Sequence, residues 1–451
     1  GNVGASAGKD VKVVGNATIT DNKAGGNNGA IQASGLVRVN GSAEIVGNEA
    51  GGNVGAISAQ KTIVVEGDAT ISGNKAGGDY GALSAVGSIR ISGDATITDN
   101  SAEGNVGAIY TKASLMLDGE ATITGNTAGK DAGAVSANKV VIGGNATISE
   151  NKAGGDFGAV SATGAMTIGG NATITDNVAA GNYGAVKADS LTIGKDGETV
   201  TAIVSNNVAG GNVGAISANN GLTVYGDLTA ENNKAAVAST TTTTTSTETL
   251  EDGSIVETTV TTTTYTGNVG AIEVANANAT ITGAAVLRNN SAAEVGAILV
   301  GGDLSANSLV LEGNTASAAT VVNTKVVKRV YDGEELISEE TLSDTTETTY
   351  SGAYGAAKVA GNVLVATDAT IVNNTAAGNV GAVSATNVAV TGNATISGNK
   401  AGGDNGAILA TGDVTVGGDA TITANEATGS VGAVSAVNVA VTGAATISEN
   451  K

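Results

Sequence analysis

The residues of this chain that could carry acid–base chemistry are carboxylates, lysines, arginines and tyrosines, because it contains no His and no Cys. This composition excludes thiol nucleophiles, imidazole bases and the common zinc ligands. A carboxylate active site needs acidic residues gathered with Arg or Lys on one face of the fold. The arginines are instead dispersed, at Arg38, Arg90, Arg288 and Arg329. The sequence therefore predicts no catalytic residues, and we expect a protein that is not an enzyme.

Two other kinds of site have partial sequence support. Gly-Gly-Asn and Gly-Gly-Asp segments could offer oxygen ligands to Ca²⁺, but the nonapeptide repeat that binds Ca²⁺ in β-solenoids is missing. Gly125 to Lys130 falls one residue short of a phosphate-binding P-loop. We expect solvated corners at both places, and no metal or cofactor.

Four Asn-Ala-Thr segments match the acceptor pattern for N-glycosylation, at Asn16, Asn145, Asn171 and Asn393. Asp occupies the aligned position in other repeats, at Asp68, Asp94 and Asp419. A shared turn preference of Asn and Asp therefore explains the pattern without a sugar.

Charge and hydropathy limit the partners. The net charge of -21 repels the phosphates of nucleic acids and anionic lipids. No segment approaches the eighteen or so consecutive apolar residues of a membrane span. We therefore expect no nucleic acid partner and no direct membrane insertion.

The elements that would position any site come from one repeated phrase, Asn-Lys-Ala-Gly-Gly-(Asn/Asp)-X-Gly-Ala-Ile-Ser-Ala, seen at residues 48–59 and 74–85. Its Gly-Ala pair recurs about every 25 or 26 residues, and an Asn follows each pair about nineteen residues later. The pairs begin at Gly4, Gly29, Gly55, Gly81, Gly107, Gly133, Gly158, Gly184, Gly214, Gly270, Gly296, Gly355, Gly381, Gly406 and Gly432. Such a period predicts a repeat architecture rather than several globular domains.

Three short strands are expected in each repeat, for example at residues 55–59, 62–65 and 69–72, because apolar residues alternate there. Ile57, Ile63, Val65, Ala69 and Ile71 should point inward. One repeat cannot bury its apolar face alone, so it must stack on its neighbours. We expect an all-β protein: a single continuous right-handed parallel β-helix over residues 1–451, with about 15 coils and a length of roughly 70 Å at ~4.8 Å per coil.

The recurring Asn should form a buried ladder, because its amide can donate to one coil and accept from the next. The glycine pair after it, such as Gly77 and Gly78, is expected to need a positive φ at a sharp corner. The repeat at Asp227 carries Leu228 and Ala230 where most repeats carry Ala and Ile. If both positions face inward, this exchange conserves core volume.

Two insertions interrupt the array just after the ladder position, at residues 236–266 and 317–351. Each contains a turn signal, Asp252-Gly253 or Asp332-Gly333, between arms rich in Thr, Val and Ile, and each returns through a tyrosine, Tyr265 or Tyr350. They are interpreted as long β-hairpins that leave the same corner and could pair with each other. A disordered or glycosylated linker is the alternative for the threonine run.

The sequence leaves the role of two columns of residues open. Thr-X-Thr or Thr-X-Ser on the third strand forms an outward array that resembles ice-binding surfaces, but Glu44, Glu231, Arg288 and Glu312 interrupt it. The residue before Gly-Ala is usually Val, and it is aromatic at Tyr80, Phe157, Tyr183 and Tyr354. This second column is either an exposed stripe for packing against another molecule or part of the core.

The steps Ile71-Ser72-Gly73-Asn74 and Gly81-Ala82-Leu83 resemble the FxxN and GGAI repeats of chlamydial polymorphic outer-membrane-protein passengers and of other bacterial β-helix adhesins. The resemblance covers nearly all of the chain outside the insertions. This chain has Ile where Phe is usual in the family, and Val or an aromatic residue in place of the first Gly. The family implies secretion, a right-handed β-helix and a surface or adhesive role.

We therefore expect an extracellular or cell-surface structural and adhesive rod. Lys451 follows the ladder Asn and Gly1 aligns with the second corner Gly, so the repeat nearly continues from end to start. This favours self-association, by head-to-tail or lateral contacts, or membership of a longer array. A monomeric adhesin that binds a host surface or a glycan is the main alternative. An ice-binding protein and a polysaccharide-degrading β-helix enzyme are the lesser ones.

Overall fold

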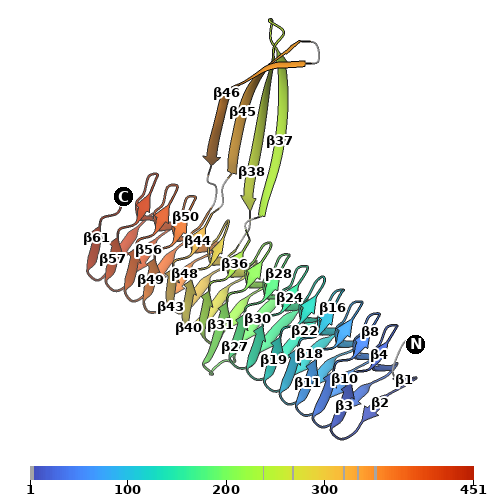
Figure 1. The fold of residues 1–451 in the computed structure, drawn as a ribbon. Coiled ribbons are helices and arrows are strands. Elements are labelled where there is room, and N and C mark those ends of the chain that lie inside the picture. Colours follow the sequence, from blue (N-terminus) through green and yellow to red (C-terminus); the bar gives the residue numbers. More distant parts are fainter. Residues whose placement is uncertain (1–4, 237, 267–268, 318–319, 333–334, 350–352) are drawn as a thin grey trace.

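The computed structural model is a long parallel β-solenoid with its first and last coils at opposite ends (Figure 1). It describes residues 5–236, 238–266, 269–317, 320–332, 335–349 and 353–451. The regular elements in these ranges are all β-strands, and none of the described residues forms a helix long and apolar enough to span a membrane. The predicted parallel β-helix is confirmed. Gly1, Gly4, Gly333, Tyr350 and Ser351, which entered the sequence predictions, lie outside the described residues.

One coil shows the repeating unit. Its strands are β9 (Ile57–Ala59), β10 (Ile63–Val65), β11 (Ala69–Ser72) and β12 (Lys75–Ala76). The first three are the predicted strands, and the two-residue β12 directly after the ladder Asn was not predicted. Equivalent strands pair in parallel from coil to coil, forming sheets of 15, 28 and 14 strands. The 28-stranded sheet takes two strands from most coils, and its two longest members, β40 (Ala279–Arg288) and β43 (Leu304–Glu312), each run through both positions.

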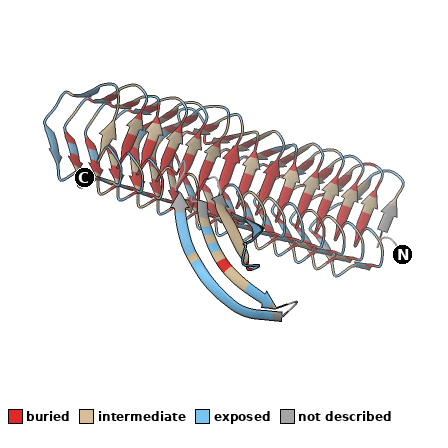
Figure 2. Ribbon diagram, turned by 90° about the horizontal axis from the view of Figure 1, so that it is seen from above, coloured by how far each residue is buried: buried red, intermediate tan, exposed pale blue. Residues whose placement is uncertain are grey.

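The core lies inside the coils along the solenoid up to the last coil, residues 431–451, in which no residue is buried (Figure 2). Every residue predicted to point inward in the representative coil is at most 2% exposed, and Ser58, Thr70 and Ser72 on the alternate positions are not buried. The exchanged residues Leu228 and Ala230 are both buried as well. Leu228 lies between small residues of the adjacent coils, Ala202 and Ala285, so volume is conserved along the stack.

The predicted Asn ladder is present, and its side chains are hydrogen-bonded from one coil to the next. Asn151 donates from its side-chain Nδ2 to Asn177 Oδ1 at 2.9 Å and to the carbonyl oxygen of Ile123 at 2.9 Å, and its backbone N–H donates to Asn177 Oδ1 at 3.1 Å. Its own Oδ1 accepts from the backbone N–H and the Nδ2 of Asn126. These bonds use the whole amide, which allows Asn to be fully buried.

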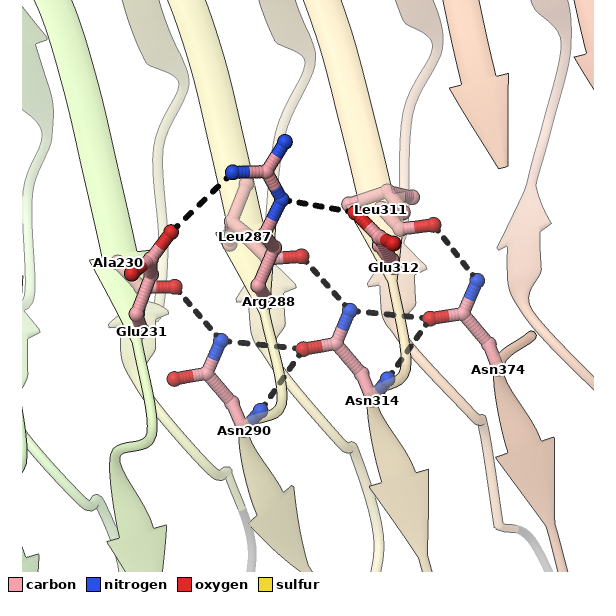
Figure 3. A network of polar contacts seen from close by, with 9 residues as sticks. All are labelled: Ala230, Glu231, Leu287, Arg288, Asn290, Leu311, Glu312, Asn314 and Asn374. Atoms are coloured by element: carbon pink, nitrogen blue, oxygen red, sulfur yellow. Dashed lines mark hydrogen bonds and ion pairs between the residues drawn. The ribbon is translucent and has the colours of Figure 1, made fainter. Parts of the chain in front are cut away.

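The ladder passes both insertions without interruption, and Figure 3 shows it passing the second one. Asn233 and Asn290 are 57 residues apart in sequence, yet their Nδ2 and Oδ1 atoms are 3.0 Å apart. Asn314 and Asn374, 60 residues apart, make the same bond at 3.0 Å. The insertions therefore leave the solenoid at a corner without disturbing the stacking of the coils.

A left-handed residue precedes every ladder Asn. The residues at this position have φ between 52° and 68°, and they include glycines such as Gly73, and Asp, Asn, Glu and Ala elsewhere. The expectation of positive φ at Gly77 and Gly78 is wrong, because neither is among the described residues with positive φ. A Cβ on Gly77 would instead meet the carbonyl oxygen of Gly51 at 2.6 Å. Gly77 is explained by close approach of the preceding coil, and the left-handed turn lies four residues earlier, at Gly73.

The glycine of the Gly-Ala pair is also explained by close approach, in this case of the following coil. A Cβ at Gly107 would lie 1.8 Å from the carbonyl oxygen of Gly133 in the next coil. Equivalent glycines from Gly29 to Gly406 meet a following carbonyl at 1.7 to 2.0 Å. Only glycine fits, so this position stays the same in every coil.

The two insertions form antiparallel hairpins that join into one sheet above the solenoid (Figure 1). The first hairpin consists of β37 (Ala238–Thr249) and β38 (Ile255–Thr266), and the second of β45 (Thr320–Asp332) and β46 (Glu335–Thr349). β38 pairs antiparallel with β45 over residues 255–264, so the strand order is β37-β38-β45-β46. The predicted pairing between hairpins is confirmed. We call this four-stranded unit the hairpin sheet.

Candidate functional site

The arginines do not converge on one site, although Arg38 and Arg90 lie in one column of the second strand, two coils apart. Arg38 pairs with Glu66 and Arg90 with Asp118, each across neighbouring coils. Arg288 lies between Glu231 and Glu312, at 3.4 and 2.8 Å (Figure 3). The three residues that interrupt the threonine array there thus form one row of opposite charges. Among the residues that the structure describes, no group of three or more His, Cys, Asp or Glu side chains is placed to hold a metal ion.

The hairpin sheet is the most exposed feature of the molecule. Its first edge strand is exposed throughout residues 241–249, and the described side chains of β46 are nearly all exposed as well. Threonines face each other across the first hairpin, with hydroxyl oxygens 3.1 Å apart in the pair Thr241 and Thr263 and 3.3 Å apart in the pair Thr243 and Thr261. The threonine run is therefore an ordered strand, and the disordered-linker alternative does not hold for it.

Ion pairs tie the two hairpins together near the far end of the sheet. Arg329 of β45 contacts Glu257 of β38 at 2.6 Å and Glu339 of β46 at 2.9 Å. Lys328 contacts Asp252, in the turn of the first hairpin, at 3.1 Å. A single partly exposed pair contributes little, but a guanidinium shared by two strands restrains their relative position. The hairpin sheet therefore behaves as one unit at its far end.

The turn of the first hairpin contains a carboxylate with a strongly shifted pKa. The hydroxyl and the backbone N–H of Ser254 both donate to Asp252 Oδ1, at 2.5 and 3.0 Å, and together with Lys328 they lower the pKa of Asp252 to about 2. A folded-state pKa below the ordinary value means that this stabilisation is present above about pH 4 and is lost as the pH falls through about 2.

We expect Ser254→Ala to raise the pKa of Asp252 toward its ordinary value of about 3.9, because the hydroxyl donor is its largest cause. An NMR titration of the Asp252 carboxyl carbon measures this directly. The control is Ser246→Ala, a serine on exposed β37. An unchanged titration in Ser254→Ala would contradict the hydrogen bond.

A second polar cluster lies on the outer face of the 15-stranded sheet, on β29 (Val186–Ala188), β33 (Ile216–Ala218) and β39 (Ile272–Val274). Lys187 Nζ donates to Ser217 Oγ at 2.9 Å and to Asn219 Oδ1 at 2.5 Å, and Ser217 Oγ donates to Glu273 Oε2 at 2.7 Å. The Lys187 ammonium also lies 4.9 Å from the centre of the Tyr183 ring. Sequence reasoning missed this cluster, although Lys187 and Glu273 replace the serine usual at the middle of the first strand, which Ser217 retains.

Burial shifts the pKa values of Lys187 and Tyr183 more than neighbouring charges do. It lowers the pKa of Lys187, while the carboxylates of Glu273 and Asp189 oppose that shift. It also raises the pKa of Tyr183. Lys187, Tyr183 and Asp189, together with Phe157, line a surface hollow of about 400 Å³. The arrangement offers an aromatic edge, amide groups and a cation, which could bind a small polar ligand.

The column before Gly-Ala is mainly core. Val106, Val213 and Val380 are at most 2% exposed, whereas Tyr80 and Tyr183 are half-buried. Tyr80 stacks on Tyr110 with ring centres 4.3 Å apart, and burial, followed by Tyr110 and nearby charge, raises the pKa of Tyr80 to about 12. Of the two interpretations of this column, the core is supported. The aromatic members interrupt it as half-exposed rings, and two of them, Phe157 and Tyr183, stack on each other with ring centres 5.5 Å apart.

The outward array on the third strand is regular for only part of the rod. Thr or Ser occupies both outward positions in five successive coils, on β11, β15 (Ala95–Thr98), β19 (Ala121–Thr124), β23 (Ala146–Ser149) and β27 (Ala172–Thr175). Beyond it, Ile203 and the row of Glu231, Arg288 and Glu312 change the chemistry of the surface.

The acidic and amide corners have a structural role. Asp68 and Asp94 each accept a hydrogen bond from the backbone N–H of the following coil, and Asn145 and Asn171 do the same. Asn and Asp are therefore equivalent at this corner, as the sequence predicted. The match of Asn-Ala-Thr to a glycosylation acceptor follows from this shared role.

No protein-family model, no curated protein and no solved structure matches this chain in comparisons of sequence and fold.

Proposed function

We propose that this chain is an extracellular structural and adhesive rod that uses the hairpin sheet as its main contact surface. The observation that carries the proposal is that two insertions, separated by a single coil-to-coil step of the ladder, combine into one exposed sheet while the solenoid below continues unchanged. An insertion that served only the fold would bury apolar residues against the rod. This sheet instead extends away from it (Figure 2).

The rod is suited to holding such a sheet at a defined position. Its coils are joined by in-register parallel strands and by the Asn ladder, and long-range contacts are therefore repeated at every step. Any further coil with the same phrase would extend the three sheets and the ladder. The proposal therefore includes membership of a surface fibre, through end-to-end stacking or within a longer array.

A host surface or a glycan is the partner class that we propose for the adhesive contact. The hollow beside Lys187 and Tyr183 is a second candidate contact, because it combines amides, a cation and half-buried aromatic rings. The chain would then act as a monomeric adhesin that binds through the side of the rod. The two surfaces have no residue in common, so they can be tested separately.

The decisive variant replaces residues 236–267 and 317–352 with Gly-Gly, which restores the usual seven-residue spacing between the ladder Asn and the Gly of Gly-Ala. Because the ladder already bridges both insertions, we expect this variant to fold as an uninterrupted solenoid. We expect its binding to a printed glycan array and to cultured epithelial cells to fall at least about tenfold relative to the intact chain.

The matched control keeps the hairpins and carries Lys187→Met. A loss of binding confined to this control would move the adhesive contact to the hollow on the 15-stranded sheet. Equal binding by the intact chain and the hairpin-deleted chain would contradict the role of the hairpin sheet. Circular dichroism and a thermal melt confirm that both variants remain folded.

A further inference from the structure

The hairpin sheet has one edge that is open to another strand. β37 pairs with β38 over residues 238–249 without a register shift, and no strand within the described residues pairs with its other side. Its side chains are exposed from residue 241 to 249. Glu248 is the only charged residue of the strand, which has no Lys and no Pro. Natural sheets usually protect such an edge with charges, bulges or prolines, because its free N–H and C=O groups bind another strand.

The opposite edge has those protections. β46 carries Glu335, Glu339, Glu340, Asp344 and Glu347. Its pairing with β45 also contains two register shifts. Acidic side chains and irregular pairing both discourage the addition of a strand. The two edges of one small sheet therefore differ in the feature that controls strand addition.

The sheet also has little core of its own. Val327 is its only buried hydrophobic residue among those described. Val256, Val260, Val322 and Val326 share one face, as the pairing register shows, and remain only half-buried. A small sheet with two open faces is marginally stable, so further strands would stabilise it.

We propose that β37 pairs antiparallel with β37 of a second copy of this chain, joining two hairpin sheets into one sheet of eight strands. A second copy is the occupant that matches this edge. It would place Thr opposite Thr, as β37 and β38 already do at Thr241 and Thr243. The net charge of -21 also disfavours close approach of two copies except where the surface is neutral, as it is along residues 241–247.

Symmetry and charge limit which residues of the two β37 strands can lie opposite each other. In an antiparallel pair related by a two-fold axis perpendicular to the sheet, residues that lie opposite each other point to the same face. This requires the axis to pass beside a single residue of β37 rather than between two residues. An axis beside Thr243 pairs Thr241 with Thr245. It places the two Glu248 side chains ten positions apart, roughly 33 Å at ~3.3 Å per residue, well beyond the ~8 Å screening length of physiological salt. The solenoids then lie at opposite ends of the joined sheet.

This contact is independent of the adhesive function proposed above, and it is measured without any ligand. Sedimentation equilibrium of the full chain should show a monomer–dimer equilibrium below about 1 mM. We expect the double variant Thr242→Lys with Thr244→Lys to raise the dissociation constant at least about fivefold, because it places like charges opposite each other twice. The matched control is Ser343→Lys with Thr345→Lys, which adds the same charge on the same face of the other edge strand.

Comparing the two double variants shows whether β37 forms the contact. A chain that stays monomeric to about 1 mM, or a dimer weakened equally by both double variants, would overturn the proposal. Thr243→Cys provides a second measurement, since the chain has no other cysteine. Opposite residues of antiparallel strands have Cα atoms about 4.5 to 5.5 Å apart, within disulfide range. Thr243→Cys should form a disulfide dimer and Thr345→Cys should not; the reverse result rejects the β37 contact.

Discussion

Replacing Asn151 with leucine is expected to lower the free energy of unfolding by about 3 to 5 kcal/mol, because several buried groups lose their partners at once. The carbonyl of Ile123, Oδ1 of Asn177, and the backbone N–H and Nδ2 of Asn126 all bond to Asn151. None of these groups can turn to solvent, since the ladder residues are fully buried. Leucine is similar in size, so the loss measures the polar bonds rather than a cavity.

Hydrogen exchange and thermal unfolding measure this effect. The backbone N–H of Asn126 should lose protection most, and coils far from Asn151 should keep theirs, because each coil contacts mainly its neighbours. The control is Thr147→Val, an isosteric change at an exposed position of the same coil. A stability loss for Asn151→Leu of less than about 1 kcal/mol would show that the ladder bonds contribute little.

Gly81→Ala is expected to have the second large effect, a loss of about 3 kcal/mol or more. The new Cβ would lie 1.7 Å from the carbonyl oxygen and 2.7 Å from the carbonyl carbon of Gly107. Both are backbone atoms of the bend between Val106, which pairs with both neighbouring coils, and β17 (Ile109–Thr111), so they cannot yield without separating the coils. The separation would break the 15-stranded sheet at this step.

Gly73→Asn is the matched control in the same coil. Gly73 has φ 61°, and the nearest atom to a Cβ there is 3.8 Å away. Asn occupies the equivalent left-handed position at Asn206 and Asn232. We expect a change within about 1 kcal/mol for Gly73→Asn. If urea unfolding shows similar losses for both substitutions, close approach is not the reason for the glycine at position 81.

The repeat and its inward face were predictable because they depend on local alternation copied many times. Ile57 and Ile63 point inward by period two, and the stacking of identical coils makes the same prediction at every step. The exchange of Leu228 and Ala230 strengthened that prediction from within a single sequence. The ladder was predictable for the same reason, since a polar residue that recurs once per coil must bond along the axis.

The corners were less predictable. The left-handed residue before each ladder Asn is Gly in some coils and Asp, Asn, Glu or Ala in others, which hides the shared φ, although Asp, Asn and Gly are enriched there. The glycine of the Gly-Ala pair, such as Gly81, recurs in every coil because atoms of another coil leave no room for a Cβ. A single repeat contains no information about how close its glycine lies to the backbone of a neighbouring coil.

The sequence by itself therefore determined the coil, its core and the places where the hairpins leave it. Only the tertiary structure decided the strand order of the hairpin sheet, the ion pairs of Arg329 with Glu257 and Glu339, and the cluster around Lys187. Local alternation and turn residues specify a strand or a hairpin, but contacts between residues that are dozens of positions apart depend on how the coils stack. That stacking brings the two hairpins together and leaves β37 at the free edge.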